Sequence, residues 1–548
     1  MASYVGIDLG TTESTVSVIE IDSRLDEPLE KLKTLSIYQY DSSHKFDRDN
    51  KGLQSSIYID RDNKVIYTGE YAKALYSSGN KPLNTIRSIK TRIGGESMID
   101  IPLGNNKKDL KAYDMTELSA VLLKSIKKSL DKQLNGNSIE TTTITIPAGF
   151  NSDEREATLD AAKIAGFKDI QLLDEPTAVL LNILNLEEPL IEDEFLYEAK
   201  NILVYDLGGG TLDISIANVE EENGDYNVKI LGRSQRMDFG GDDVDKYIAA
   251  YFLEEFEKIN PSINERSIEE QAVIVSRIVS QAEKSKIAFD TKISKVLEHQ
   301  RRRQKAKESV NFEIIDNLKV TDLILTDEIL KKLLANIIDE NGFLLMPLKK
   351  SLKGIGLKKE DIDLVILTGG SSKFYLVEET IQRFFNINNG LEETPIISFT
   401  SSNAVSRGAV IHSHNKNNED LKKIELSDTL SDSIFIKVGN KFHELISQNL
   451  GSKNRGTYKY KFETPSKRLE VFLYSGISTE EKYKYKEITG VYRVLDRWHD
   501  KDEEIEIKWE FTSDKVVHLY FEEEELLNTK KDYDEVCSLI NEFEINKI

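Results

Sequence analysis

Two short segments of the sequence could bind phosphate, and both contain the tripeptide Asp-Leu-Gly. The first is Asp8-Leu9-Gly10-Thr11-Thr12, and the second is Asp206-Leu207-Gly208-Gly209-Gly210-Thr211. Each follows an apolar run typical of a buried β-strand, so each strand delivers a carboxylate at its end. The glycines let backbone N–H groups approach a polyphosphate, and the threonine hydroxyls add donors. The two turns therefore predict a duplicated site that holds one nucleotide between its halves.

The two aspartates imply a metal ion. A carboxylate beside a phosphate is repelled unless a divalent cation lies between them. Asp8 and Asp206 therefore predict Mg²⁺, which prefers oxygen ligands and retains several of its waters. The alternative is that both segments are ordinary junctions between a strand and a turn. The occurrence of two copies in the same context favours phosphate binding over this alternative.

Composition and charge exclude several classes of function. The 548 residues carry a formal net charge of −22, which repels nucleic acid and anionic membranes over most of the surface. The single cysteine, Cys537, excludes an internal disulfide and agrees with a reducing compartment. No apolar run approaches the roughly 18 residues of a membrane span, and no signal peptide is visible. We expect a cytoplasmic protein that binds neither nucleic acid nor a membrane.

The elements that must position the two turns alternate between strands and helices. The strand predicted over 141–146 is stopped by Pro147, and a capping-box pattern from Asn151 to Glu154 opens a helix that ends near Gly166. Further strands and helices follow, which predicts an α/β domain over residues 1–414. The polar stretch 415–425 predicts an interdomain linker.

Beyond the linker the hydrophobic pattern changes to a period of two. Alternate apolar positions over residues 426–521 predict a small, mainly antiparallel β-sandwich. Residues 522–548 predict a short helical segment. The basic run Arg301-Arg302-Arg303 lies in a polar stretch, which predicts a solvated surface rather than a binding patch.

Several collinear segments resemble the seventy-kilodalton heat-shock (DnaK-type) chaperones, which belong to the actin-like ATPase superfamily. These segments are 6–12, 144–148, 174–178, 205–213, 240–245, 282–286 and 365–371. The resemblance covers residues 1 to about 412, and 426–521 only in outline. It implies a duplicated, two-lobed actin-like ATPase domain followed by a β-sandwich that binds polypeptide. The chain resembles a divergent, short member that lacks the family's helical lid.

The resemblance also implies roles for individual residues. Lys90, Glu175, Asp206 and Thr211 match the family's catalytic positions, and a lysine is a point charge suited to the γ-phosphate and the attacking water. Beyond the two turns, the residues implied to bind nucleotide are Gly240, Gly241, Asp242, Glu283, Lys286, Gly369, Gly370, Ser371 and Lys373. For Glu283 and Lys286, three residues apart on a predicted helix, a mutual surface ion pair is the alternative.

Pro147 and Arg155 match the family's interdomain switch pair. The implied cofactors are ATP or ADP and Mg²⁺, with K⁺ as a further candidate ion. The implied partners are an unfolded or extended polypeptide client, a J-domain co-chaperone and a nucleotide-exchange factor. Lys373, Asp290 and Ser402 depart from the family's pattern. Because lysine cannot stack on a base as arginine does, we expect altered adenine binding.

Together these features predict an ATP-dependent molecular chaperone. Its ATPase domain would regulate the binding of extended polypeptide segments by the β-domain. Two other classes remain open. An actin-like small-molecule kinase would use the same turns, although the family-like segment 84–90, which ends at Lys90, and the β-sandwich argue against it. In residues 421–426 charged residues interrupt the apolar positions, where the family's linker is a nearly continuous apolar strand. A nucleotide-gated binding or assembly protein, with a dedicated client and slow or no turnover, would suit this altered linker and the altered base-binding residues.

Overall fold

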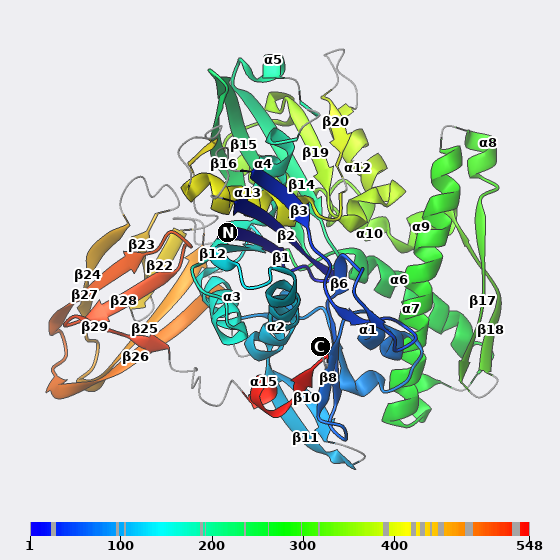
Figure 1. Ribbon diagram of the computed structural model, residues 1–548, viewed down its shortest axis with the longest axis horizontal. Coiled ribbons are helices and arrows are strands. Elements are labelled where there is room, and N and C mark those ends of the chain that lie inside the picture. Colours follow the sequence, from blue (N-terminus) through cyan, green and yellow to red (C-terminus); the bar gives the residue numbers. More distant parts are fainter. Residues whose placement is uncertain are drawn as a thin grey trace.

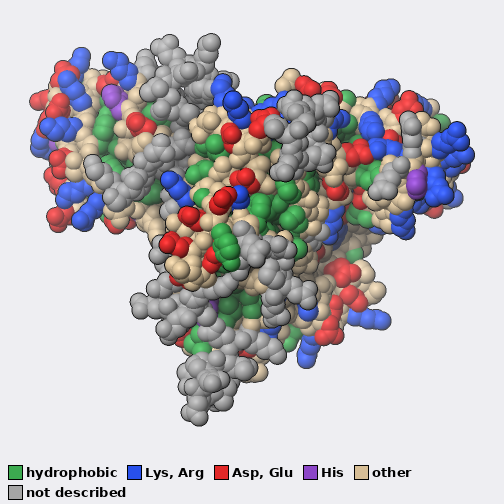
Figure 2. Space-filling model, turned by 90° about the horizontal axis from the view of Figure 1, so that it is seen from above, with side chains coloured by type: hydrophobic (Ala, Val, Ile, Leu, Met, Phe, Trp, Pro, Cys, Tyr) green, Lys and Arg blue, Asp and Glu red, His purple; other side chains and the backbone are tan. Residues whose placement is uncertain are grey.

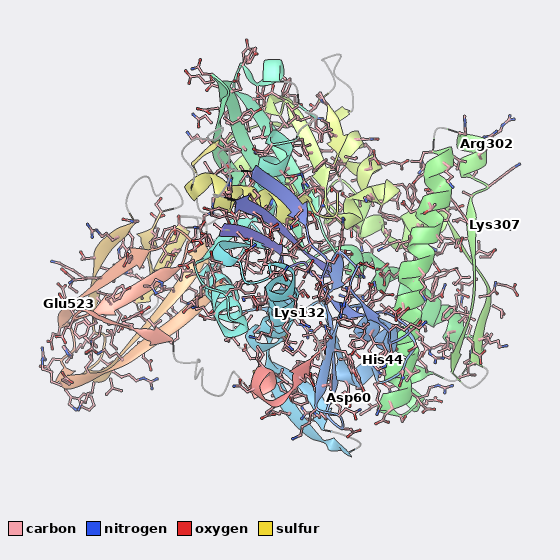
Figure 3. The ribbon with its side chains drawn as sticks, in the orientation of Figure 1. His44, Asp60, Lys132, Arg302, Lys307 and Glu523 are labelled. Atoms are coloured by element: carbon pink, nitrogen blue, oxygen red, sulfur yellow. The ribbon has the colours of Figure 1, made fainter. Side chains whose placement is uncertain are left out.

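The structure is a computed structural model with two α/β lobes and a smaller β-domain (Figure 1). Glu523, in the β-domain, and Lys307, in lobe II, lie at opposite ends of the molecule (Figure 3). The residues that the structure describes are 2–22, 29–94, 98–103, 106–186, 190–191, 193–234, 237–260, 262–297, 299–315, 318–386, 394–399, 401–417, 424–427, 433–438, 441–447, 454–476, 486–528 and 538–546.

Lobe I is built on a sheet with the strand order β13-β12-β1-β2-β3, in which β1 is parallel to β12 and antiparallel to β2. Its strands are β1 (Ala2–Asp8), β2 (Glu13–Asp22), β3 (Leu29–Thr34), β12 (Ser138–Ile146) and β13 (Ile170–Asp174). The other elements of lobe I are β4 (Gln39–Tyr40), β5 (Phe46–Asp47), β6 (Gly52–Gln54), β7 (Ser56–Asp60), β8 (Val65–Thr68), β9 (Thr85–Arg87), β10 (Met98–Leu103), β11 (Asn106–Asp114), α1 (Glu70–Ser77), α2 (Met115–Gln133) and α3 (Ser152–Ala165).

Lobe II is built on a second sheet with the order β20-β19-β14-β15-β16-β21. These strands are β14 (Lys200–Leu207), β15 (Leu212–Glu222), β16 (Asp225–Arg233), β19 (Leu364–Thr368), β20 (Ile396–Ser398) and β21 (Ile424–Ser427). Like β1, β14 has an antiparallel neighbour that follows it in sequence and a parallel neighbour from further along the chain. The two sheets therefore repeat one arrangement, and β1 and β14 occupy equivalent positions.

The helices of lobe II cover this sheet and carry a protruding hairpin. The elements are α4 (Glu175–Leu184), α5 (Asp193–Leu196), α6 (Gly241–Glu257), α7 (Ile268–Ile293), α8 (Gln300–Arg303), β17 (Lys307–Ile315), β18 (Leu318–Thr326), α9 (Asp327–Leu333), α10 (Ala335–Ile338), α11 (Met346–Gly354), α12 (Tyr375–Asn386) and α13 (Ala404–Asn417). Among the described residues, no helix combines the length and apolarity needed to cross a bilayer.

Local signals account for individual helices. The predicted capping box of α3 is confirmed, because the Asn151 side chain accepts from the Glu154 N–H and the Glu154 carboxylate accepts from the Asn151 N–H. The same helix ends at Gly166, whose φ of 94° is left-handed. The two sheets are joined through α13, which packs against β1 and α4. A Cβ on Gly408 would lie 1.7 Å from the carbonyl oxygen of Ala178, so this close helix crossing requires glycine.

The β-domain consists of two antiparallel sheets with the orders β23-β22-β25-β26-β30 and β24-β27-β28-β29. Apolar side chains of both sheets share one core, as expected for a β-sandwich. The strands are β22 (Ser433–Val438), β23 (Lys441–Ile446), β24 (Arg455–Lys461), β25 (Ser466–Gly476), β26 (Lys486–His499), β27 (Glu504–Phe511), β28 (Val517–Phe521), β29 (Glu524–Glu525) and β30 (Leu527–Asn528).

The observed elements differ from the sequence expectations near the domain boundaries. Helix α13 runs to Asn417, past the predicted start of the linker, and residues 418–423 lie outside the described residues. Strand β21 then joins the lobe II sheet, where it runs parallel to β16. Strands β29 and β30 follow the predicted end of the β-sandwich at residue 521. Two further elements, α15 (Ser538–Glu542) and β31 (Glu544–Ile545), lie against lobe I.

Candidate nucleotide-binding site

The turns that follow β1 and β14 lie against each other at the junction of the lobes. A Cβ on Gly209 would lie 1.8 Å from Thr12 Oγ1, and one on Gly210 would lie 2.7 Å from Thr11 Cγ2. The backbone of the second turn is therefore in contact with side chains of the first. Because β1 and β14 occupy equivalent positions in the two sheets, the turns that follow them meet at this junction. A cavity of about 530 Å³ opens between them.

Most residues predicted to bind nucleotide line this one cavity. They are Asp8, Gly10, Thr11, Thr12, Lys90, Glu175, Asp206, Gly208, Gly209, Thr211, Gly241, Asp242, Glu283, Lys286, Gly369, Gly370, Ser371 and Lys373. Gly210 and Gly240 are not lining residues. A Cβ on Gly240 would lie 2.5 Å from the carbonyl carbon of Gly209, so the backbone of Gly240 packs directly against the second turn. Pro147 and Arg155 lie outside the cavity.

The charged groups at the two turns are crowded. Burial and the nearby carboxylate of Glu175 raise the pKa of Asp8 to about 7. The same two causes raise the pKa of Asp206 well above its usual range. Lys90, whose side chain is 4% exposed, contacts the Glu175 carboxylate. The cluster therefore holds more carboxylate than ammonium groups, an arrangement that a divalent cation would relieve.

Asp213 belongs to the same electrostatic cluster, and it was not among the predicted site residues. Burial and the carboxylate of Glu175 raise the pKa of Asp213 to about 7. The residue lies on β15, directly opposite Asp206 in the register of β14 and β15. Its position at the end of the segment Thr211-Leu212-Asp213 was the only sequence signal for it.

The groups present fit a magnesium-bound polyphosphate. The hydroxyl oxygen of Thr12 is buried and has no hydrogen-bond partner within the described part of the chain, so it is available to a phosphate. The described residues contain no group of three or more His, Cys, Asp or Glu side chains arranged to hold a metal. Mg²⁺ beside Asp8 and Asp206 would therefore complete its coordination with phosphate oxygens and water.

The second turn is held in place by the start of α6. The N–H of Gly241 donates to the Gly208 carbonyl at 3.1 Å, and the N–H of Asp242 donates to the Gly209 carbonyl at 2.7 Å. The Asp242 carboxylate accepts from the hydroxyl of Ser88 in lobe I. The helix start thus fixes the phosphate turn and also links the two lobes.

Glu283 and Lys286 do not pair with each other. Glu283 pairs with Lys73 of α1 at 2.8 Å, and Lys286 pairs with Asp245 of α6 at 2.8 Å. The alternative of a mutual ion pair is therefore wrong for this structure. The Lys73 contact connects α1 in lobe I with α7 in lobe II. Glu283 and Lys286 both line the cavity in which the resemblance predicts nucleotide binding.

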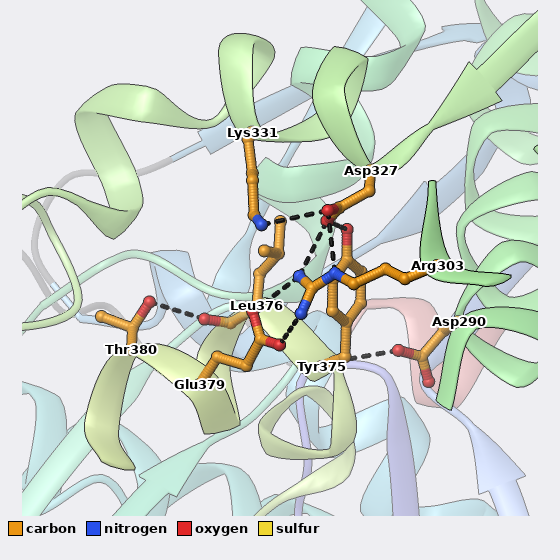
Figure 4. Close-up of polar contacts among 8 residues, drawn as sticks. All are labelled: Asp290, Arg303, Asp327, Lys331, Tyr375, Leu376, Glu379 and Thr380. Atoms are coloured by element: carbon orange, nitrogen blue, oxygen red, sulfur yellow. Dashed lines mark hydrogen bonds and ion pairs between the residues drawn. The ribbon is translucent and has the colours of Figure 1, made fainter. Parts of the chain in front are cut away.

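The lining of the cavity also contains residues that the sequence analysis did not assign to it. Ile287, Thr291, Phe374 and Val377 add a mostly apolar part of the wall. Asp290, noted only as a departure from the family pattern, lies among them, and its carboxylate accepts from the N–H of Tyr375 at 2.9 Å (Figure 4). Lys373 and Ser402 also line the cavity.

The predicted solvated surface at the arginine run is correct for two of its members. Arg301 and Arg302 are exposed, and Figure 2 shows Lys and Arg side chains gathered at the end of the molecule that carries α8. The prediction is wrong for Arg303, which pairs with Asp327 at 2.9 Å and with Glu379 (Figure 4). Arg303 is the last residue of the short helix α8, and its ion pairs connect α8 with α9 and α12.

Arg155 lies where lobe I contacts the β-domain. Its guanidinium donates to Asp174 at 2.9 Å, and Arg233 of β16 pairs with the same carboxylate at 2.8 Å. Lys515, from the turn between β27 and β28, approaches Asp174 at 3.1 Å. Burial alone would raise the pKa of Asp174, but Arg233, Lys515 and Arg155 hold it far below its usual value. Asp174, which directly precedes Glu175, therefore joins both lobes and the β-domain.

We expect Asp174→Ala to lower the free energy of unfolding by about 3–5 kcal/mol, because it removes the buried carboxylate that Arg155, Arg233 and Lys515 share. Lys515→Ala should cost clearly less, because Asp174 keeps Arg155 and Arg233. Urea unfolding of the two variants beside the parent chain measures both changes. Equal and small losses in the two variants would contradict a central role for Asp174.

Comparison with known families agrees with this site. A family model described as Hsp70 protein matches residues 68–494. The matched region contains the second phosphate turn, Lys90, Glu175, and the cavity wall from Gly369 to Lys373, and it continues into β26 of the β-domain. Because the match covers more than half of the sequence, the chain belongs to the Hsp70 family, whose members are ATP-dependent chaperones with an actin-like ATPase domain and a β-sandwich domain.

Proposed function

We propose that this chain hydrolyses MgATP between its two phosphate turns and thereby regulates how its β-domain binds extended polypeptide. One observation carries the proposal. Two equivalent strand-to-turn units lie in contact, and Lys90 and Glu175 line the same cavity as both turns. A pair of surface turns without a ligand would not need buried, crowded carboxylates at their centre.

Phosphoryl transfer to water requires positioning and charge neutralisation rather than a covalent nucleophile. In the proposed mechanism the Lys90 ammonium binds the γ-phosphate, and Glu175 and Asp206 orient the attacking water. The Thr211 hydroxyl and the backbone N–H groups of the glycine turns hold the remaining phosphate oxygens. Mg²⁺, when bound, would neutralise the developing charge on the phosphates.

We propose two routes from the nucleotide site to the β-domain. One is β21, which leads from the lobe II sheet into the β-domain. The other is Asp174 with its partners Arg155 and Lys515, and Pro147 ends the strand β12 that lies beside it. Because Asp174 and Glu175 are adjacent, movement of Glu175 toward a γ-phosphate would be transmitted to Lys515. In this proposal Arg155 acts through Asp174, and Pro147 is its partner in the proposed switch pair.

The proposed client is an unfolded or extended polypeptide. An extended segment can add to an exposed sheet edge, where backbone hydrogen bonds supply affinity and side-chain pockets supply selectivity. Within the described residues, β23 and β24 are edge strands of the β-domain. We further propose a J-domain co-chaperone and a nucleotide-exchange factor, which the family membership suggests. A cytoplasmic location and K⁺ as an additional ion at the phosphates are also part of the proposal.

The proposal is tested by the dissociation rate of a labelled extended peptide in the presence of ADP and of ATP. We expect ATP to speed release by about 5–150-fold, which corresponds to a coupling of about 1–3 kcal/mol. Titration calorimetry with MgATP, and again after chelation of Mg²⁺, tests the nucleotide half separately. Identical release rates would contradict the proposed coupling, and the absence of binding heat with MgATP would contradict the proposed nucleotide site.

A second candidate function is a nucleotide-gated binding protein with slow or no turnover. The observation that favours it is the altered cavity wall, in which the Asp290 carboxylate accepts from the Tyr375 N–H and Lys373 is also a lining residue. Such a protein would change peptide affinity when ATP binds, without hydrolysis. Rapid-quench measurement of ATP cleavage in a single turnover separates the two functions.

A further inference from the structure

The segment 538–546 is built into lobe I although it follows the β-domain in sequence. Helix α15 packs on α2, and β31 pairs in parallel with β8, next to α2 in Figure 1. The N–H of Glu544 donates to the Lys64 carbonyl at 3.0 Å, and the N–H of Asn546 donates to the Ile66 carbonyl at 2.8 Å. The segment therefore covers the edge of a lobe I sheet in the order β31-β8-β7-β9.

The side chains of this segment belong to the lobe I core. Leu539, Phe543 and Ile545 are buried together with residues of β7, β8 and α2. The Arg61 guanidinium lies over the Phe543 ring at 6.0 Å. Lys128 of α2 donates to the Ile545 carbonyl at 2.9 Å. The segment thus contributes apolar contacts and polar contacts on the same surface.

Asn546 makes the most specific contacts. Its side chain is fully buried, and its carbonyl oxygen accepts from the Thr68 N–H at 2.9 Å. Its amide nitrogen donates to Thr68 Oγ1 at 2.7 Å and to Ser125 Oγ at 3.0 Å. Both hydroxyl groups are themselves buried and bonded to each other at 2.8 Å. Lobe I therefore offers a strand edge to the backbone of the segment and buried polar groups that the Asn546 side chain hydrogen-bonds.

We infer that lobe I contains a binding site for a short extended peptide, that residues 538–546 of the same chain fill it, and that this segment straps the β-domain to lobe I. The β-domain leaves lobe II at β21 and returns to lobe I at α15, so the ATPase body holds it at both ends. From Asn528 to Ser538 the chain can span at most about 35 Å even when fully extended. The strap thereby raises the effective concentration of the β-domain at its contact with lobe I. The strap involves no nucleotide.

Two amides report on the contact between the β-domain and lobe I. The Leu172 N–H donates to Asp514 at 2.8 Å, and the Val517 N–H donates to Ser152 Oγ at 2.9 Å. The Thr68 N–H, which donates to Asn546, reports on the strap itself. Hydrogen exchange at these three amides therefore distinguishes loss of the strap from loss of domain contact.

The test uses the full chain with a site-specific protease sequence inserted between Asn528 and Ser538. After cleavage of the folded protein, we expect the Thr68 amide to stay protected, because the segment keeps its own site. Exchange at Leu172 and Val517 should rise by about ten-fold or more, because the tether is gone. Unchanged exchange at Leu172 and Val517 would overturn the strap. Loss of Thr68 protection after cleavage would overturn the peptide site.

Point substitution provides the second arm of the test. Asn546→Ala should raise exchange at Thr68, Leu172 and Val517 together, because it removes the acceptor of the buried Thr68 N–H and the amide donor to two buried hydroxyl oxygens. Asn541→Ala is the matched control, since Asn541 lies in the same segment and is exposed. We expect this control to exchange like the parent chain at all three amides. Equal effects of the two substitutions would overturn the specific role of Asn546.

Discussion

Lys90→Ala is expected to lower the rate of ATP hydrolysis by about 10²–10³-fold while MgATP still binds. The Lys90 side chain is 4% exposed and contacts Glu175, so its ammonium lies among carboxylates rather than in water. Its removal takes away the cation assigned to the γ-phosphate but leaves the glycine turns that hold the other phosphates. Rapid-quench hydrolysis and titration calorimetry measure the two quantities separately.

The same substitution has a further electrostatic consequence. Burial raises the pKa of Asp8 and of Asp213, and Lys90 opposes that rise. Without Lys90 these pKa values should rise further above 7. The two carboxylates would then be more protonated at neutral pH, so Mg²⁺-dependent binding should shift toward higher pH. A titration of MgATP affinity over about three pH units around these raised pKa values measures this shift.

Lys132→Ala is the matched control, because Lys132 is exposed on the outside of α2 (Figure 3). This variant should hydrolyse and bind ATP like the parent chain. Unchanged turnover in Lys90→Ala would contradict the catalytic assignment. Loss of both turnover and binding would instead make Lys90 a residue that supports the site.

Gly369→Ala is expected to lower the free energy of unfolding by about 1–3 kcal/mol and to weaken MgATP binding by at least about ten-fold. Gly369 has φ +85°, a left-handed conformation that alanine adopts at a cost. Its Cβ would lie 2.4 Å from Asp206 Oδ1 and 2.4 Å from the Leu207 carbonyl oxygen. The substitution must therefore displace the second phosphate turn or the metal-site carboxylate. Thermal unfolding and calorimetry measure the two effects.

Gly370→Ala tests whether these effects depend on the exact position. Gly370 lines the same wall, but a Cβ built there has no atom of the described residues within 4 Å apart from those of its own turn. The stability of this variant should be close to that of the parent chain. Equal destabilisation by both substitutions would show that the turn tolerates no side chain, rather than that Gly369 protects Asp206.

Much of the candidate site could be predicted because its signals are local. The carboxylates and glycines of each turn are adjacent in sequence, and the strands before them have continuous apolar runs. The capping box at Asn151 and the left-handed end at Gly166 are likewise contained within a few residues. Their mutual placement followed from a resemblance over the whole domain, and the structure brings them to one cavity.

Other residues could not be predicted because their partners are distant in sequence. Asp174 pairs with Arg233 of the second lobe and with Lys515 of the β-domain, and the residues beside Asp174 in the sequence predict neither contact. The sequence places Arg303 in an exposed basic run, whereas the structure pairs it with Asp327 of α9 and Glu379 of α12. Asp290 is similar, because its partner is the backbone of Tyr375.

The sequence by itself determined the two phosphate turns, the strand and helix patterns around them and the change to alternating strands in the β-domain. These depend on backbone freedom and hydrophobic period, which are properties of short segments. Only the tertiary structure decided which cations surround Asp174 and where residues 538–546 lie. Strand β31 is too short for its sequence to show a hydrophobic period. The free energy of its pairing with β8 arises from groups that come into contact only when the chain folds.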